Sequence, residues 1–218
     1  MTDEYTLNFM KTSKKRYLGP HTSAAFFADP KHLVFTVSRY KFAAKMLSGM
    51  GSALEVGCGD GFGSTIVAQE VERVVGIDYE PYAIENCGDN GFSGEMFVHD
   101  ILSSSYPEKF DAVYSLDVIE HIQPEKEHLF LRNIVNSTKD NGVLIIGTPN
   151  VTSSPYASEG SEAGHINLKS FSSLKESLSQ YYSKVFMFGM NDEVLHTGFG
   201  PMCHYLMALA VQPINPVK

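Results

Sequence analysis

The chain has 218 residues, of which 43% are hydrophobic, and it carries a formal net charge of −8 with three cysteines. This length fits one domain with a substantial core, and an acidic chain lacks the basic face with which proteins bind nucleic acid. The sequence shows no secretory leader, no apolar run of membrane-spanning length and no paired cysteine motif. We therefore expect a cytoplasmic protein without membrane insertion, disulfides or a nucleic-acid partner.

The first fifty residues differ in composition from the rest of the chain. The stretch YLGPHTSAAFFADPKHL is rich in aromatic residues, proline and histidine and has no clean period, whereas residues 37–51 show helical spacing of apolar positions. We expect residues 1–50 to be a helical lid or cap that folds over a bound ligand. The alternative is a helix that only covers the edge of the sheet.

Strands and helices alternate from Ala53 onward. Apolar segments predict five strands, at residues 53–56, 73–78, 95–100, 110–117 and 143–150. Helical patterns lie between them, at residues 63–71, 81–87 and 123–142. This alternation predicts a parallel sheet with helices on both faces.

The order changes after residue 150. A long polar loop at 151–168 precedes a helix at 169–182, and two strands follow at 184–190 and 203–212. Because no helix separates the two strands, they should pair antiparallel, with the last strand beside the fifth. Residues 51–218 thus form one α/β domain, a seven-stranded Rossmann-like sheet that is mostly parallel with an antiparallel last strand.

The stretch ALEVGCGDGFGS, residues 53–64, predicts a ligand site. Its alternate glycines follow the first strand directly, and such a turn lets a ligand lie against the backbone and the following helix N-terminus. Asp78 ends the second strand, where an acid can accept hydrogen bonds from a ribose diol. A nicotinamide dehydrogenase is the alternative, but Phe62 occupies the place of its third glycine.

Five motifs in order carry a resemblance to a known family. They are LEVGCGDGFGS, VVGIDYEPYAIENC, FVHDI, FDAVYSLDVIEHI and LFLRNIVNSTKDNGVLIIGTPN, which span residues 54–150. Together they resemble class I S-adenosylmethionine-dependent methyltransferases, in particular the ubiquinone-biosynthesis O-methyltransferase type. The closing antiparallel hairpin also fits that family, whereas residues 1–50 and the 150–170 loop match it only loosely.

The resemblance implies S-adenosylmethionine as cofactor and a role for each matching residue. Glu55 supports the glycine turn, and the methionine part of the cofactor lies against Gly57, Cys58, Gly59 and Leu116. The ribose binds Asp78, and the adenine contacts Tyr79, Asp100 and Ile101. In the cap, Tyr17 and Arg39 would face the cofactor, with Arg39 on its carboxylate. The alternative for Asp78 is that its carboxylate caps the next helix, and the alternative for Asp100 is that its carboxylate caps a loop.

The residues after the fourth strand predict the chemistry. Asp117, Glu120 and His121 in SLDVIEHIQP resemble the E-x-x-E-H of ubiquinone-type and small-RNA 2′-O-methyltransferases, where these residues are assigned to magnesium or a related ion. Here Asp117 stands in place of the first Glu, and its shorter side chain brings the carboxylate less far toward an ion. A divalent ion lowers the pKa of a bound hydroxyl, and His121 or His165 could act as the base. His165 could also be a fourth metal ligand. The alternatives are His121 on the substrate without metal, a purely structural Glu–His pair, and an ordinary loop histidine at 165.

Together these features predict methyl transfer to a hydroxyl of a small polar metabolite, such as a sugar, a nucleotide-linked sugar or a phenol. Metal-free N-methylation of a small amine is one alternative. A non-catalytic module that only binds the cofactor is another.

Overall fold

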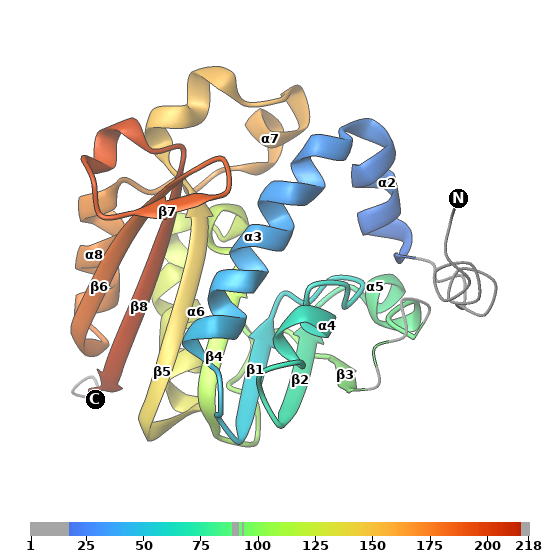
Figure 1. The fold of residues 1–218 in the computed structure, drawn as a ribbon. Helices are drawn as coiled ribbons and strands as arrows, with labels where there is room; N and C mark the ends of the chain where they lie inside the picture. Colours follow the sequence, from blue (N-terminus) through green and yellow to red (C-terminus); the bar gives the residue numbers. More distant parts are fainter. Residues whose placement is uncertain (1–17, 89–91, 93, 215–218) are drawn as a thin grey trace, which may run out of the picture.

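The structure is a computed structural model that describes residues 18–88, 92 and 94–214 (Figure 1). Its centre is an eight-stranded sheet in the order β3-β2-β1-β4-β5-β8-β6-β7. The strands are β1 Ser52–Val56, β2 Arg73–Asp78, β3 Glu95–Val98, β4 Phe110–Leu116, β5 Thr138–Pro149, β6 Tyr182–Asn191, β7 Val194–His196 and β8 Tyr205–Pro213.

Helices connect the strands. They are α2 Pro20–Ala28, α3 Pro30–Met46, α4 Ser64–Val67, α5 Pro81–Glu85, α6 Glu127–Asn136, α7 Glu159–Gly164 and α8 Phe171–Ser179. Short 3₁₀ turns complete the connections, at η1 Ile119–His121, η2 Pro124–Lys126, η3 Val151–Tyr156 and η4 Gly200–Met202. Within the described part of the chain, no helix has both the length and the apolar character needed to cross a membrane.

The sheet confirms the predicted fold class. Strands β3, β2, β1, β4 and β5 are parallel neighbours, and β8 lies antiparallel between β5 and β6. The eighth strand, β7, pairs with β6 inside the segment expected to be a loop. Its three residues are too few for a periodic signal in the sequence.

The helices predicted from residue 63 onward are longer than the observed ones, most of all the helix before β5. The helix expected over residues 123–142 ends at Asn136, and residues from Thr138 onward already belong to β5. Two hydroxyls occupy the last carbonyls of the helix, since Ser137 Oγ donates to Asn133 O at 2.9 Å and Thr138 Oγ1 donates to Ile134 O at 2.8 Å. Side-chain bonds of this kind compete with helix propagation, which explains the early end.

Apolar side chains fill both faces of the sheet, as the alternation of strands and helices predicts. On one face α6 and α8 pack against the sheet, with Phe130, Ile134 and Leu174 fully buried. On the other face, Ala43 and Ala44 of α3 are buried in a second cluster of core residues (Figure 1). The C-terminal half of α3 is therefore part of the core, although it lies within the predicted lid segment.

Close packing of α3 against the glycine stretch requires a glycine at position 63. A Cβ on Gly63 would lie 1.9 Å from Cζ of Tyr40, which projects from α3. We expect Gly63→Ala to lower the free energy of unfolding by about 1–3 kcal/mol, because the ring must move to admit the methyl group. Urea unfolding measures this. Gly160→Ala in α7 is the matched control, since nothing lies within 4 Å of its Cβ position. Equal losses in both variants would contradict the packing argument.

Candidate functional site

The glycine loop lies at the carboxyl end of β1 and is built from left-handed backbone. Gly57 and Gly59 have φ values of 81° and 53°. A Cβ on Gly57 would meet Val118 Cγ2 at 2.3 Å, whereas a Cβ on Gly59 would have no atom within 4 Å. The loop is therefore packed against protein at Gly57 and borders open space at Gly59, where a ligand can approach the backbone.

Asp78 joins the glycine loop to the end of β2. Its Oδ2 accepts from the Gly59 N–H at 3.0 Å, and its Oδ1 accepts from the Glu80 N–H at 2.9 Å. The predicted ribose-binding acid thus lies directly beside the predicted cofactor loop. The alternative role of Asp78, a cap of the next helix, falls to Glu80, which is the N-cap of α5. An ionised Asp78 carboxylate retains further acceptor sites for a ligand.

The other predicted cofactor residues differ in their exposure and in their hydrogen bonds. Tyr79 is 74% exposed, and Ile101 and Leu116 are almost completely buried in the two core clusters. Asp100 accepts from the Leu102 N–H at 2.8 Å and from Ser103 Oγ at 2.7 Å, which is the loop-capping alternative for this residue. Tyr17 lies outside the described residues.

Glu55 lies behind the glycine loop, where it supports the turn. It is 1% exposed and accepts hydrogen bonds from Tyr40 Oη at 2.9 Å, Tyr114 Oη at 2.8 Å and Ser64 Oγ. These donors come from α3, β4 and α4, so one carboxylate holds three elements together. Burial nevertheless raises the pKa of Glu55 to about 7.

The raised pKa of Glu55 gives a prediction for stability. Between about pH 4.5 and pH 7 the unfolded chain ionises this group while the folded chain keeps its proton, so its contribution to stability falls as pH rises. The difference in unfolding free energy between the native protein and Glu55→Gln should therefore shrink by about 3 kcal/mol from pH 4.5 to pH 8. Urea unfolding of both proteins checks this. A pH-independent difference would contradict it.

Arg39 and Asp117 form a part-buried ion pair between α3 and the tip of β4. Arg39 Nη1 lies 2.9 Å from both carboxylate oxygens, and the guanidinium stacks on the Tyr205 ring at 3.8 Å. Burial opposes the charge of Arg39, but Asp117 outweighs it and the pKa of Arg39 is raised. Asp117 itself has a φ of 58°, which is unusual for a residue other than glycine.

This pair involves two predicted site residues. Arg39 is predicted to bind a cofactor carboxylate and Asp117 a metal ion, and here the two contact each other. The packing of α3 brings these residues, which are far apart in the sequence, into contact. Both assignments stay predictions.

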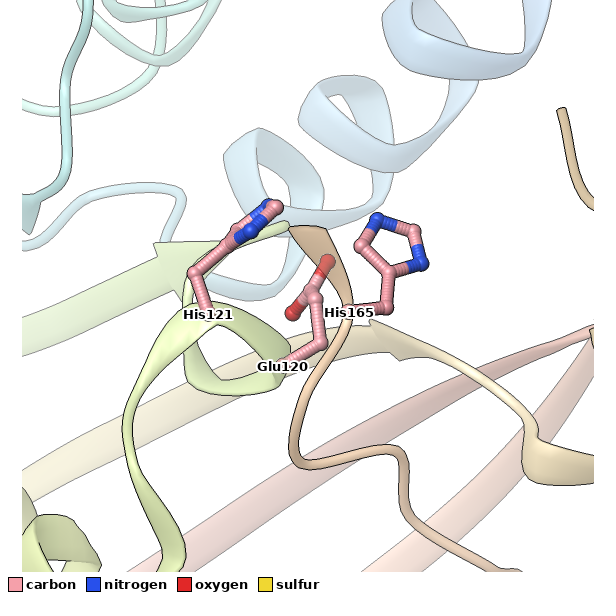
Figure 2. A group of neighbouring side chains, drawn as sticks. All are labelled: Glu120, His121 and His165. Carbon is pink, nitrogen blue, oxygen red and sulfur yellow. The ribbon is translucent and has the colours of Figure 1, made fainter. Parts of the chain in front are cut away.

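Glu120, His121 and His165 come together above the sheet. One ligand atom of each lies within 4.8 Å of those of the other two. Figure 2 shows the Glu120 carboxylate between the two imidazole rings, with His165 arriving from the segment after α7. One carboxylate and two imidazoles are a donor set that can hold a divalent ion.

Neighbouring groups orient the members of this group. Thr148 Oγ1 donates to Glu120 Oε2 at 3.0 Å, and His121 Nδ1 lies 3.0 Å from the Gly164 carbonyl oxygen. A carbonyl only accepts, so Nδ1 carries the proton and Nε2 keeps a lone pair. Burial, followed by the charge of Asp117, raises the pKa of Glu120 to about 8. Burial and the neighbouring His121 lower the pKa of His165.

Three buried polar atoms beside this group have no hydrogen-bond partner within the described residues. They are Arg39 Nε, Glu120 Oε1 and Tyr205 Oη. These atoms belong to residues of α3, η1 and β8. Gly147 leaves room for the Tyr205 hydroxyl, because a Cβ at that position would lie only 2.6 Å from the oxygen. Because buried polar groups are normally paired, this corner is suited to a polar ligand.

The sequence did not single out Tyr205 or Asp60. Asp60 is 3% exposed and accepts from Thr22 N at 2.8 Å and Thr22 Oγ1 at 3.0 Å, so it caps α2 from the glycine loop. The position of Asp60 among the glycines was a signal in the sequence that could have identified it. The sequence around Tyr205 gives no such signal, because Tyr205 reaches the site only through the pairing of β8 with β5.

Comparison with known proteins agrees with this geometry. Residues 54–146 match a family described as a methyltransferase domain. A probable S-adenosylmethionine-dependent methyltransferase of Mycobacterium tuberculosis is 29% identical over 104 residues, which cover 47% of this chain and 37% of that protein. A ubiquinone biosynthesis O-methyltransferase of Rickettsia felis is 33% identical over 107 residues, covering 47% and 43%. The chain thus matches less than half the length of these curated relatives.

Solved structures share the fold. The N-methyltransferase NodS from Bradyrhizobium japonicum, in complex with S-adenosyl-L-homocysteine, superposes with a TM-score of 0.60 at 19% identity, covering 80% of this chain and 86% of that one. An identity this low is evidence for the fold alone. Residues 54–146 are therefore similar to a methyltransferase domain, and the chain shares the fold of solved methyltransferase structures.

Proposed function

We propose that this chain binds S-adenosylmethionine and transfers its methyl group to a hydroxyl oxygen of a small polar molecule, such as a sugar, a nucleotide-linked sugar or a phenol. The observation that carries the proposal is the contact between Gly59 and Asp78 beside open space at the carboxyl edge of the sheet. In an open α/β sheet this edge is where ligands bind. The match to a methyltransferase domain, residues 54–146, includes both residues.

When bound, the cofactor would supply a methyl group already activated on a sulfonium. The task of the protein is then to align the acceptor and remove its proton. In a reaction without a metal ion, we assign proton removal to His165 or His121. The lowered pKa of His165 keeps its imidazole neutral near pH 7, and a neutral imidazole can accept a proton. The unpaired Tyr205 hydroxyl and Arg39 Nε would bind polar atoms of the acceptor.

We further propose that Glu120, His121 and His165 hold a divalent ion. The Gly164 carbonyl fixes the His121 tautomer that leaves Nε2 free, and Glu120 Oε1 has no other partner. When bound, such an ion lowers the pKa of a coordinated hydroxyl. Two imidazoles with one carboxylate suit a transition ion such as Mn²⁺ or Fe²⁺ better than Mg²⁺, which prefers oxygen ligands.

The arrangement of helices α2 and α3 is consistent with a cap over the carboxyl edge of the sheet. Asp60 of the glycine loop holds the start of α2, and Asp117 at the tip of β4 holds α3 through Arg39. Both contacts link the cap to loops that would surround the cofactor. We propose that residues 1–50 close the site and exclude water.

We also propose that the reaction takes place in the cytoplasm. This compartment is reducing, which suits three free cysteines.

The test combines binding with turnover. We expect S-adenosylhomocysteine to bind in calorimetry and the labelled methyl group of S-adenosylmethionine to reach members of a panel of hydroxyl-bearing metabolites. Binding without transfer to any acceptor would favour the non-catalytic module, and transfer only to amines in the presence of EDTA would favour N-methylation. Binding of NADH without binding of S-adenosylhomocysteine would overturn the proposal.

A further inference from the structure

Two cysteines share one backbone oxygen in the glycine loop. The Cys58 thiol lies 3.8 Å from the Gly59 carbonyl oxygen, and the Cys87 thiol lies 3.3 Å from the same oxygen. Cys58 belongs to the glycine loop, whereas Cys87 follows the short helix α5. Gly76 makes room for this arrangement, because a Cβ there would lie 2.9 Å from Cβ of Cys58.

The two thiols also influence each other. The neighbouring Cys58 thiol lowers the pKa of Cys87, and the Cys87 thiol together with burial raises the pKa of Cys58. Cys87 is therefore the more easily ionised of the two, and the thiolate is the form that reacts with oxidants. The third cysteine, Cys203, donates to the Gly200 carbonyl oxygen at 2.7 Å and belongs to a different part of the fold.

Gly59 links this pair to the candidate cofactor site. Its N–H donates to Asp78, and its carbonyl oxygen receives the contacts from both thiols. A covalent bond between the sulfurs would remove both thiol donors from the carbonyl and pull Cys58 and Cys87 together. The backbone between Gly57 and Gly59 would then no longer be free to keep the conformation that borders open space.

We propose that Cys58 and Cys87 are an oxidisable dithiol, and that a disulfide between them closes the glycine loop to S-adenosylmethionine. Formation of the bond depends only on the two thiols. Its effect on the cofactor rests on the proposed function.

The oxidant is a peroxide. The Cys87 sulfur attacks one oxygen of hydrogen peroxide, whose O–O bond breaks, and the products are a Cys87 sulfenic acid and water. The Cys58 sulfur then attacks Cys87, the S–S bond forms, and the sulfenic hydroxyl leaves as a second water with the Cys58 proton. Two thiols are oxidised and one peroxide is reduced. Cys58 and Cys87 are each 4% exposed, so α5 must open briefly to admit the peroxide. This helix has five residues and none of them is buried.

Treatment of the reduced protein with hydrogen peroxide tests the proposal. We expect the intact mass to fall by two hydrogen atoms, a peptide map to join Cys58 to Cys87, and the affinity for S-adenosylhomocysteine to fall at least about tenfold. Dithiothreitol should restore all three. Cys203→Ser should respond in the same way, because it keeps the pair.

Cys87→Ser is the decisive variant, since a serine can still donate to Gly59 and Cys87 is not among the predicted cofactor residues. Its affinity should stay within about twofold of the native value before and after peroxide. An equal loss of affinity in Cys87→Ser, or no cross-linked peptide in the native protein, would overturn the proposal. If the reduced protein does not bind S-adenosylhomocysteine at all, the proposed function fails, while the peptide map still decides whether the disulfide forms.

Discussion

Replacing Asp78 by alanine is expected to weaken binding of S-adenosylhomocysteine by about 100-fold or more. An ionised carboxylate that accepts two hydrogen bonds from a ribose diol contributes roughly 1.5–3 kcal/mol for each bond. The variant also loses the Asp78 contact that fixes the Gly59 N–H, so the glycine loop becomes less well positioned. Isothermal titration calorimetry measures the change.

Two further measurements separate binding from folding. Asp140→Ala is the matched control, because the Asp140 side chain is 95% exposed and lies away from the glycine loop; it should bind as the native protein does. Asp78→Asn keeps one acceptor and should fall between the two. Urea unfolding reports whether Asp78→Ala is folded. A folded Asp78→Ala with an unchanged dissociation constant would remove Asp78 from the site.

Replacing His165 by alanine is expected to weaken Mn²⁺ binding by about 100-fold, because one of three donors is lost. Methyl transfer by the native protein should stop in EDTA and return with Mn²⁺, whereas His165→Ala should not recover. Metal titration followed by electron paramagnetic resonance measures binding without an acceptor. His128→Ala, at an exposed position on α6, is the control and should behave as the native protein does.

A second variant distinguishes the two possible metal sets. Asp117→Asn should leave Mn²⁺ affinity within about threefold of the native value, because Asp117 pairs with Arg39 and is not among the three neighbouring donors. Loss of Mn²⁺ binding in Asp117→Asn would restore the original set of Asp117, Glu120 and His121. Full activity of the native protein in EDTA would leave His165 or His121 as a base without metal.

Local patterns predicted most of the fold. The alternation of strands and helices predicted the parallel half of the sheet, and the missing helix between the last two predicted strands predicted their antiparallel pairing. The errors in the predicted elements lie where tertiary contacts determine whether an element forms or where it ends. The end of α6 depends on the hydroxyls of Ser137 and Thr138, and β7 exists only because β6 offers it an edge.

The residues of the candidate site also divide into those that local patterns predicted and those that depend on tertiary contacts. Gly59 and Asp78 were found because they lie at fixed places after consecutive strands, and Glu120 and His121 because they are neighbours in the sequence. The sequence offered His165 as a metal ligand or as an ordinary loop histidine and could not decide between the two, and it did not predict the Arg39–Asp117 pair; each contact joins segments far apart in the chain. Side chains that reach a site through packing leave no local pattern.

A crystal structure with S-adenosylhomocysteine would test the central claim most directly. We predict ribose hydroxyls on the Asp78 carboxylate, the homocysteine part against Gly57 and Gly59, and the sulfur directed toward Glu120, His121 and His165. A complex with the ligand bound elsewhere, or with Gly59 and Asp78 free of it, would contradict the account.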